Sequence, residues 1–340
     1  MTNIWQKIKQ NAVASDRPIF VMAPMADVTD PAFRQIIAKY SRMGQGGTKE
    51  QKGSVLDALW TEFVSVDGLA STAGRPVLMR DLAYVESERP IIAQFFTSRP
   101  ENMRIAAGIA ADMGFDGIDI NMGCPDKSIE KQLCGAAMIR NPELAVEAIR
   151  AVKRGAPNLP VSVKTRIGYN KNEIDKWIPV LLAENISALT IHCRTRKEMS
   201  AVPARWEHVK EVVEIRNKIA PDTLIIGNGD VKDILDAHEK VKETGCDGVM
   251  LGRAIFGNPW LFDENKNEIP LGEKLRVMVE HTKLYEELLG DIKSFSIMKK
   301  HYKAYVNGFP GATELRARLM DCNTAGEVET VVADWMSVNS

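Results

Sequence analysis

The sequence predicts an α/β protein in which a (β/α)8 TIM barrel is followed by a small C-terminal all-α helical bundle. Three observations lead to this prediction: eight short apolar runs rich in β-forming residues, helix-like segments between most of them, and a purely helical pattern after about Pro270. Eight such units in roughly 265 residues match the usual size of this barrel. We therefore expect a barrel domain over residues 1–266 and a helical domain over residues 267–340.

The expected strands are short and follow one another at regular intervals. They are "IFVMA" from Ile19, "WTEFVS" from Trp60, "IIAQFF" from Ile91, "GIDIN" from Gly117, "VSVK" from Val161, "ALTIH" from Ala188, "LIIGN" from Leu224 and "GVMLG" from Gly248. Segments 100–114, 141–154 and 233–245 open on Pro, Asn or Asp and carry apolar residues at helical spacing, so we expect helices there.

A doubly wound sheet is the alternative to the barrel. It would place a GxGxxG motif after the first strand, and the sequence has none there. The glycine-rich stretch "GQGGTKEQKG" from Gly44 lacks that spacing and follows no strand. We interpret the polar segment from Ser41 to Asp57 as a mobile loop between the first helix and the second strand.

Four segments after Pro270 make up the expected bundle. They are "LGEKLRVMVEHTKLYEELLG", "IKSFSIMKKHYKAYVNG", "GATELRARLMDC" and "GEVETVVADWMSV", separated by Gly and Pro. Each is predicted to be helical throughout.

Composition excludes several classes of protein. With 45% hydrophobic and 26% charged residues the chain is typical of a soluble globular protein, and no apolar run is long enough to cross a bilayer. The first residues lack the apolar core of a signal peptide, so we expect a cytoplasmic protein with no membrane partner. Five cysteines, never spaced as CxxC, argue against disulfides and against a metal site. A net charge of −1 means that any nucleic acid would have to be bound by local basic patches.

Barrel enzymes build their sites from the carboxyl ends of the strands. Here these ends carry amide, cationic and glycine residues, which is hard to attribute to chance although each residue alone could be structural. The set comprises Pro24, Met25, Gln94, Asn121, Cys124, Lys164, Arg166, His192, Arg194, Asn228, Gly229, Gly252 and Arg253.

This set suits a flat heterocycle that carries a phosphate. The amides of Gln94 and Asn121 can donate and accept at the edge of such a ring, and Lys164 could stabilise negative charge on it. Gly227, Gly229 and Gly252 would let backbone N–H groups approach the phosphate. Flavin mononucleotide (FMN) fits best, while other phosphate-bearing aromatic cofactors, pyridoxal phosphate among them, remain open.

Nine sequence pieces resemble, in order and spacing, the tRNA-dihydrouridine synthase family. They are "MAPMADVTDPAFR", "TEFVS", "DINMGCPDKSI", "GAAMIRNPELA", "VSVKTRIGY", "IHCRTRKEMS", "GNGDV", "GRAIFGNPWLF" and "KHYKAYVNGFPGA". The resemblance covers nearly the whole chain. "NMGCP" and the "GNGD" and "GRAIFGNPW" pair are its most specific parts.

The resemblance implies an FMN-dependent reductase that converts uridines in tRNA to dihydrouridine with NADPH as reductant. It implies that Cys124 is the proton donor and that Asn121, Arg166 and Arg194 bind the substrate base. It implies further that FMN is held by Pro24, Met25, Gln94, Lys164, His192, Asn228, Gly229, Gly252 and Arg253.

Two other functions stay open at this point. One is an FMN barrel that reduces a small molecule such as a free pyrimidine or an enone, and the other is a non-catalytic RNA-binding barrel. Basic residues in the terminal helices and around the expected mouth could bind tRNA phosphates. They are Lys293, Lys299, Lys300, Lys303, Arg316 and Arg318 in the helices, and Lys127, Lys131, Arg194, Arg196 and Lys197 at the mouth. The sequence leaves the oligomeric state open, with a monomer as our expectation.

Overall fold

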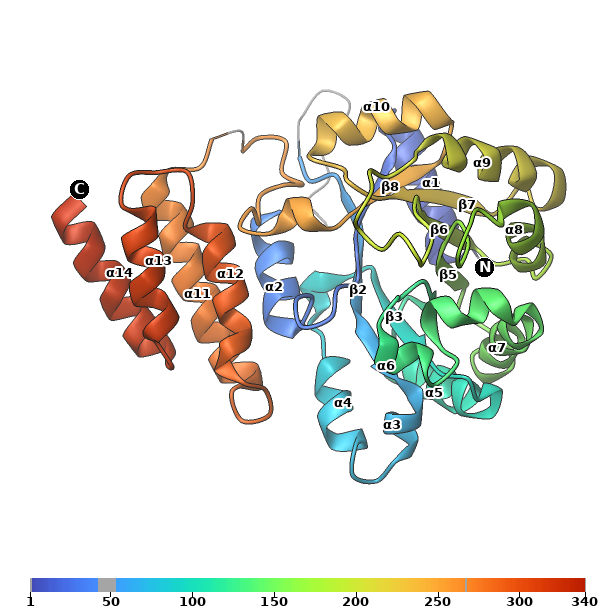
Figure 1. Cartoon of the computed structure of the whole chain (residues 1–340), viewed down its shortest axis with the longest axis horizontal. Helices are drawn as coiled ribbons and strands as arrows, with labels where there is room; N and C mark the ends of the chain where they lie inside the picture. Colours follow the sequence, from blue (N-terminus) through green and yellow to red (C-terminus); the bar gives the residue numbers. More distant parts are fainter. Residues whose placement is uncertain (1, 42–52, 267, 340) are drawn as a thin grey trace.

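A closed barrel of eight parallel strands forms the larger part of the molecule (Figure 1). We describe residues 2–41, 53–266 and 268–339 of a computed structural model. The strands follow sequence order, and β1 pairs with both β2 and β8, which closes the barrel. Their bounds are β1 Ile19–Met22, β2 Leu56–Ser65, β3 Ile91–Phe96, β4 Gly117–Met122, β5 Val161–Arg166, β6 Ala188–His192, β7 Leu224–Asn228 and β8 Gly248–Leu251. The predicted fold class is confirmed.

Helices surround the barrel strands. They are α2 Pro31–Tyr40, α3 Val66–Ala70, α4 Arg75–Asp81, η1 Glu86–Glu88, α5 Pro100–Asp112, α6 Lys127–Glu130, η2 Gly135–Arg140, α7 Pro142–Gly155, α8 Ile174–Leu182, α9 Glu207–Ile219, α10 Ile234–Thr244 and η3 Arg253–Ile255. The short α6 and η3 lie in the loops at the carboxyl ends of β4 and β8. Helix α1 (Ile4–Ala14) precedes the first strand. The expected starts and stops hold: Asp233 caps α10 by accepting from the backbone N–H of Asp236, and Gly245 ends it in the left-handed region.

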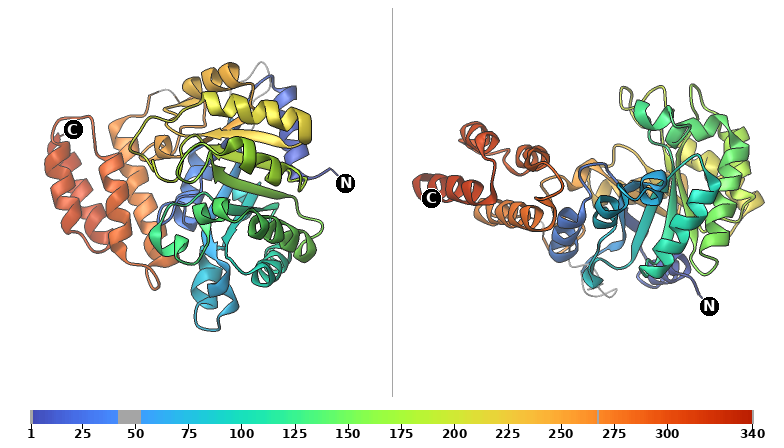
Figure 2. Two further views of the ribbon diagram at one scale, coloured as in Figure 1. Left: turned by 45° about the vertical axis from the view of Figure 1, so that its right-hand side comes forward. Right: turned by 90° about the horizontal axis from the view of Figure 1, so that it is seen from below.

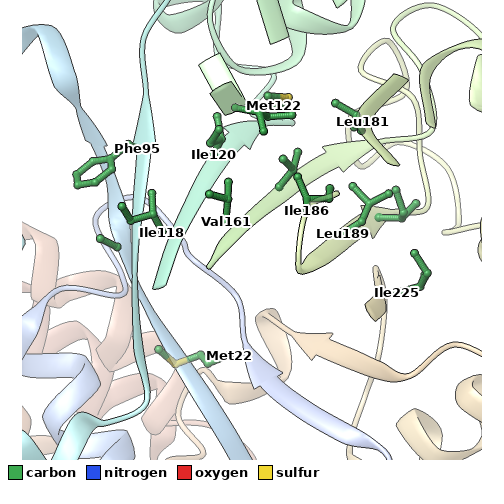
Figure 3. Packing of buried hydrophobic residues seen from close by; sticks show 14 of the residues in the cluster. Met22, Phe95, Ile118, Ile120, Met122, Val161, Leu181, Ile186, Leu189 and Ile225 are labelled. Carbon is green, nitrogen blue, oxygen red and sulfur yellow. The ribbon is translucent and has the colours of Figure 1, made fainter. Parts of the chain in front are cut away.

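Side chains alternate along each barrel strand between the apolar layer under the helices and the barrel interior. The outward residues Ile118, Ile120 and Met122 of β4 belong to the apolar layer between the strands and the helices (Figure 3). Because side chains alternate along a strand, Asp119 and Asn121 face the barrel interior. At the opposite end of the interior, Trp5 packs against Trp60 with 5.8 Å between ring centroids. The interior is therefore apolar at its amino end and polar at its carboxyl end.

The helical bundle lies to one side of the barrel, next to α2 (Figures 1 and 2). It consists of α11 Leu271–Leu289, η4 Phe295–Ile297, α12 Met298–Tyr305, α13 Ala312–Asp321 and α14 Ala325–Asn339. Its apolar core includes Met278, Tyr302 and Leu315, together with Ala32 and Ile36 of α2. The division into domains 1–266 and 267–340 stays a prediction.

Two predicted boundaries were wrong. Strand β2 begins at Leu56, not at Trp60, so Asp57 belongs to the strand and not to the predicted loop. Asp57 can occupy a buried strand position because it pairs with Arg17 (2.7 Å) and accepts from the backbone N–H of Phe20 (2.8 Å). Residues 42–52 of that loop lie outside the described residues. The segment before α12 also begins with a turn, and helical structure starts only at Phe295.

Candidate active site

A cavity of about 630 Å³ opens at the carboxyl ends of the strands. A volume of this size is typical of pockets for small molecules and cofactors. Its wall comes from the segment that follows β1 and from the carboxyl ends of β5, β6, β7 and β8 with the residues that follow β6, β7 and β8. The predicted residues in that wall are Pro24, Met25, Lys164, Arg166, His192, Arg194, Asn228, Gly229, Gly252 and Arg253. Gln94, Asn121 and Cys124 lie outside this wall, on β3, β4 and the turn that follows β4.

Lys164 is a half-buried cation without a partner in the part of the chain that the structure describes. Its ammonium has no hydrogen bond or ion pair there, whereas most buried charges are paired. Burial, and next the positive charge of Arg166, lower the pKa of Lys164 to about 8. The side chain is therefore still mostly charged at pH 7 and could bind an anionic group.

His192 ends β6 and pairs in register with Arg166 on one side and Asn228 on the other. Its Nδ1 is buried and has no hydrogen-bond partner among the described residues. Burial, followed by the charge of Arg166, lowers the pKa of His192 well below its ordinary value. The ring is neutral at pH 7, and neither ring nitrogen has a hydrogen-bond partner within the described residues, so the ring could bond to a ligand.

The loop after β7 has a backbone that only glycine adopts easily. Gly229 has φ of 132°, and a Cβ there would come within 2.8 Å of the Ala204 side chain. The backbone N–H groups of Gly229, Asp230 and Gly252 donate to no acceptor within residues 2–41, 53–266 and 268–339. Three donors at the same end of the cavity as Arg253 make this end suitable for a phosphate.

Asp230 at this end was missed in the sequence, although it is part of the quoted "GNGDV" piece. Its carboxylate accepts hydrogen bonds from Arg194, from Arg253 (2.5 Å) and from the backbone N–H of Ala204 (2.8 Å). The hydrogen bond from Arg194 is the main reason that the pKa of Asp230 is lowered. Arg194 also donates to the carbonyl of Val202 (2.5 Å), so most of its guanidinium is already bound within the protein.

Gly227 has a different role from the one predicted. A Cβ at this position would lie 2.2 Å from the ring of Trp206, whose Nε1 donates to the Gly229 carbonyl (2.9 Å). The glycine therefore makes room for a buried tryptophan beneath the loop. The prediction that Gly227 lets a ligand phosphate approach was wrong.

Cys124 lies on a turn that Asn121 organises. The Asn121 Oδ1 accepts from the backbone N–H groups of Gly123 (3.1 Å) and Cys124 (2.9 Å). Arg166 fixes the same turn from below, because its Nε donates to the Gly123 carbonyl (2.7 Å). The Cys124 carbonyl accepts from the N–H of Ala136 (2.9 Å), which connects the turn to η2.

The Cys124 side chain is half-buried, and burial raises the pKa of its thiol. The charges of Arg166 and Lys164 act in the opposite direction but are weaker influences. The thiol is thus protonated at neutral pH, which suits a proton donor and does not suit a nucleophile.

Behind this turn lies a hydrogen-bonded chain that the sequence did not reveal. Asn121 Nδ2 donates to Gln94 Oε1 (3.1 Å), and Gln94 Nε2 donates to Asp119 Oδ2 (2.6 Å). Asp119 Oδ1 accepts from the Ser162 hydroxyl (2.6 Å). The period of two along "GIDIN" could have placed Asp119 on the same face as Asn121.

Several predicted RNA-binding cations are occupied by other contacts. Lys293 is bound between Glu62 (2.8 Å) and Asp81 (2.8 Å), and Lys300 contacts Asp27 (3.3 Å). Similar contacts engage Arg196 with Glu130, Lys299 with the Met320 carbonyl, Arg316 with the Val306 carbonyl and Arg318 with Asp334. Of the predicted RNA-binding cations, those that are exposed and have no such contact within the described residues are Lys127, Lys131 and Lys197 at the expected mouth and Lys303 in the bundle.

Comparison with known proteins places the chain in a family. The family model described as "Dihydrouridine synthase (Dus)" matches residues 21–338. The chain belongs to the dihydrouridine synthase family. A curated relative from Bacillus subtilis (strain 168), named "Probable tRNA-dihydrouridine synthase 2", is 36% identical over 335 residues, which are 98% of this chain and 96% of the relative. A relative from Staphylococcus aureus (strain MRSA252), named "Probable tRNA-dihydrouridine synthase", is also 36% identical over 98% of this chain and 95% of its own.

Solved structures show likeness of fold alone for this dihydrouridine synthase family member. A complex of 2-naphthoyl-CoA reductase superposes with a TM-score of 0.52 at 11% identity, over 75% of this chain and 51% of the reductase chain. Within the described residues, no helix combines the length and apolar character needed to span a bilayer. The same residues contain no group of three or more His, Cys, Asp or Glu side chains arranged to hold a metal ion.

Proposed function

We propose that this chain is a tRNA-dihydrouridine synthase that reduces the C5=C6 bond of uridines in tRNA to 5,6-dihydrouridine. The observation that carries the proposal is a protonated, half-buried thiol, Cys124, on a rigid turn beside a cavity of cofactor size, in a chain of this family. The curated relatives with matching length support the same activity.

We infer that the cofactor is FMN, because the free groups of the cavity fit its parts. The Lys164 ammonium and the His192 ring, both in the cavity wall, have no partners among the described residues and suit a polar ring that carries negative charge. The free N–H groups of Gly229 and Gly252, with Arg253, suit one phosphate. The FMN-binding set proposed from the resemblance is Pro24, Met25, Gln94, Lys164, His192, Asn228, Gly229, Gly252 and Arg253, and all of these except Gln94 line the cavity. NADPH is the proposed source of electrons.

In this proposal the residues of the cavity would hold FMN, which in its reduced form would supply the hydride for C6 of the uracil. The chain's own task is to deliver a proton to C5, and the Cys124 thiol holds that proton at neutral pH. Asn121, Arg166 and Arg194 would orient the base. Nη2 of Arg166 and Nη1 of Arg194 have no acceptor within the described residues, so each arginine keeps a donor for this purpose.

The tRNA would be held by basic residues at the mouth and on the bundle. Lys127, Lys131 and Lys197 are exposed in the loops that follow β4 and β6, and Lys303 is exposed on α12. We propose that residues 267–340 form a domain that contributes RNA affinity and that the protein acts in the cytoplasm, where its substrate is found. A monomer is the simplest assembly consistent with this proposal.

A turnover assay tests the proposal directly. Protein loaded with FMN is given NADPH and tRNA from cells that lack dihydrouridine, and nucleosides are then analysed by mass spectrometry. We expect NADPH oxidation matched by uridines that gain two hydrogens, with free uridine left unreduced. NADPH-dependent reduction of free uridine or an enone, with none in tRNA, would overturn the proposal.

A further inference from the structure

We propose that Asp119 is a positioning residue that orients Gln94 and Asn121 and thereby holds the Cys124 turn in place. The catalytic meaning of this role rests on the proposed function, whereas the positioning itself does not. Asp119 is fully buried in the barrel interior, and its hydrogen bonds go to Gln94 and Ser162, not to Cys124. Its influence on the Cys124 turn must therefore pass through other side chains.

Strand register brings together the four residues of this hydrogen-bonded network. Asp119 of β4 pairs with Gln94 of β3 and with Ser162 of β5, so the three side chains point inward at one level. Asn121 lies two residues further along β4 and therefore faces inward one level closer to the mouth. The chain Ser162–Asp119–Gln94–Asn121 thus runs from inside the barrel to the turn.

The Asp119 carboxylate determines which group donates and which accepts in each hydrogen bond of this network. An ionised carboxylate only accepts hydrogen bonds, so the NH2 group of Gln94 must face Asp119. The Gln94 oxygen then faces Asn121 and requires its NH2 group, which leaves the Asn121 oxygen for the two N–H groups of the turn. If either amide were rotated by 180°, two donors or two acceptors would meet. Asp119 removes this ambiguity.

The cost of burying Asp119 supports a specific role. Burial raises the pKa of Asp119 to about 6, and the hydrogen bonds from Gln94 and Ser162 oppose that shift. The group is ionised at pH 7 in an interior where an apolar side chain would need no desolvation. The same negative charge acts to raise the pKa of the unpaired Lys164.

Three variants separate the positioning role from packing. Asp119→Leu removes the acceptor, so that Gln94 and Asn121 can rotate and the turn loosens. Asp119→Asn keeps the chain, because its oxygen can accept from Gln94 while its NH2 donates to the Ser162 hydroxyl. Gln94→Met removes the amide that connects Asp119 to Asn121 and so interrupts the same network at the next residue. Asp57→Leu is the matched control, since Asp57 is another buried barrel carboxylate and bonds to Arg17 and Phe20 instead.

The measurement is the rate at which iodoacetamide alkylates Cys124 in the protein without tRNA, with the modified residue identified by peptide mass spectrometry. We expect the rate to rise about 3- to 10-fold in Asp119→Leu and in Gln94→Met, the range for losing one hydrogen bond. The double variant should show no further increase, because both changes break one chain. Asp119→Asn should restore a rate near that of the unaltered protein.

Folding is checked by near-ultraviolet circular dichroism. Three results would overturn the proposal. They are an equal rise of the Cys124 alkylation rate in Asp57→Leu, additive rises in the double variant, or a rate in Asp119→Asn as high as in Asp119→Leu. If Asp119→Leu does not fold, the Gln94→Met and Asp119→Asn rates decide alone. The readout needs no dihydrouridine formation, so failure of the proposed function and failure of this inference remain distinguishable.

Discussion

The Cys124 thiol is protonated and its backbone is held in place, and these two properties determine what replacing Cys124 should do. Its thiol is protonated because burial raises its pKa, and Asn121 holds the backbone of its turn. Cys124→Ala should leave flavin bound and reducible by NADPH while slowing uridine reduction by about 10²–10⁴-fold, the range for losing a general acid. Stopped-flow absorbance of the flavin, with tRNA added after reduction, separates the two steps.

Cys193→Ala is the control for this experiment. Cys193 is also a free cysteine, but it is fully buried in the apolar layer outside the barrel strands. The Cys193→Ala protein should therefore reduce tRNA at nearly the normal rate. Normal reduction of tRNA by Cys124→Ala would mean that another group supplies the proton.

Lys164 should make flavin binding depend on pH. The pKa of Lys164 in the free protein is lowered to about 8, and a bound anion would raise it again. Binding therefore takes up a proton above pH 8, so affinity is complete below that pH and falls as pH rises through it. Fluorescence titrations with FMN should show a weaker complex at pH 9 than at pH 7, and Lys164→Met should bind weakly with little change over this range.

Asp119→Asn offers a second check on the same lysine. Because the Asp119 charge acts to raise the pKa of Lys164, its loss should move the decline in affinity to lower pH. An unchanged profile in both variants would show that another group is responsible for the pH dependence.

At the scale of single elements, the turn after β4 depends on the start of η2. Gly135 has φ of 60°, and a Cβ there would lie 2.7 Å from the Cys124 carbonyl. Gly135→Ala should push the turn away from Asn121 and lower tRNA reduction by about 10- to 100-fold, since small displacements of reacting groups are costly. Flavin affinity should change little, because η2 does not line the cavity.

Gly245→Ala tests whether backbone strain alone explains such a loss. Gly245 has φ of 70° at the end of α10, and nothing lies within 4 Å of the Cβ position. This variant should be destabilised by about 1 kcal/mol and keep its activity. Equal activity losses in the two glycine variants would refute the steric explanation.

At the scale of the whole molecule, one lysine connects the bundle to the barrel. Lys293 lies between Glu62 of β2 and Asp81 of α4, and all three side chains are largely buried. Lys293→Met should leave two buried carboxylates uncompensated and lower the free energy of unfolding by about 3–5 kcal/mol. Urea unfolding followed by circular dichroism measures this change.

Arg80→Met is the matched control, because Arg80 also connects the two parts through Asp291 (2.6 Å) but both side chains are exposed. An exposed pair contributes at most about 1 kcal/mol. If Lys293→Met lowers the free energy of unfolding by no more than this, the buried ion pairs of Lys293 do little to hold the bundle against the barrel.

RNA binding should involve those cations that the protein itself does not use. Lys303→Ala should weaken tRNA binding and reduce the slope of log affinity against log salt concentration by about 1, the value for one phosphate contact. Lys283→Ala is the control, because Lys283 already pairs with Glu329 on the same bundle (2.6 Å). Filter binding at several salt concentrations measures both. Equal slopes in Lys303→Ala and the unaltered protein would leave the bundle without a phosphate contact at this position.

Local sequence patterns were enough to predict the barrel, most of its strands and the end of the barrel at which the site lies. Strand and helix periods are local properties, so runs such as "IIAQFF" and "ALTIH" were predicted with their observed bounds. The residues that line the cavity could be named because the carboxyl ends of parallel strands in a barrel always meet. The β2 start was missed because Asp57 looks like a loop residue until its partner Arg17 is known.

Which polar groups are free and which are already bonded could not be predicted without the three-dimensional contacts. Arg194 and Lys293 look like available cations in the sequence, yet Asp230 binds the first and Glu62 and Asp81 bind the second. Lys164 and His192 look no different, yet they lack partners among the described residues. Hydrogen bonds and ion pairs act over a few ångströms between residues far apart in the chain, so their partners are fixed by strand register and helix packing and not by local sequence.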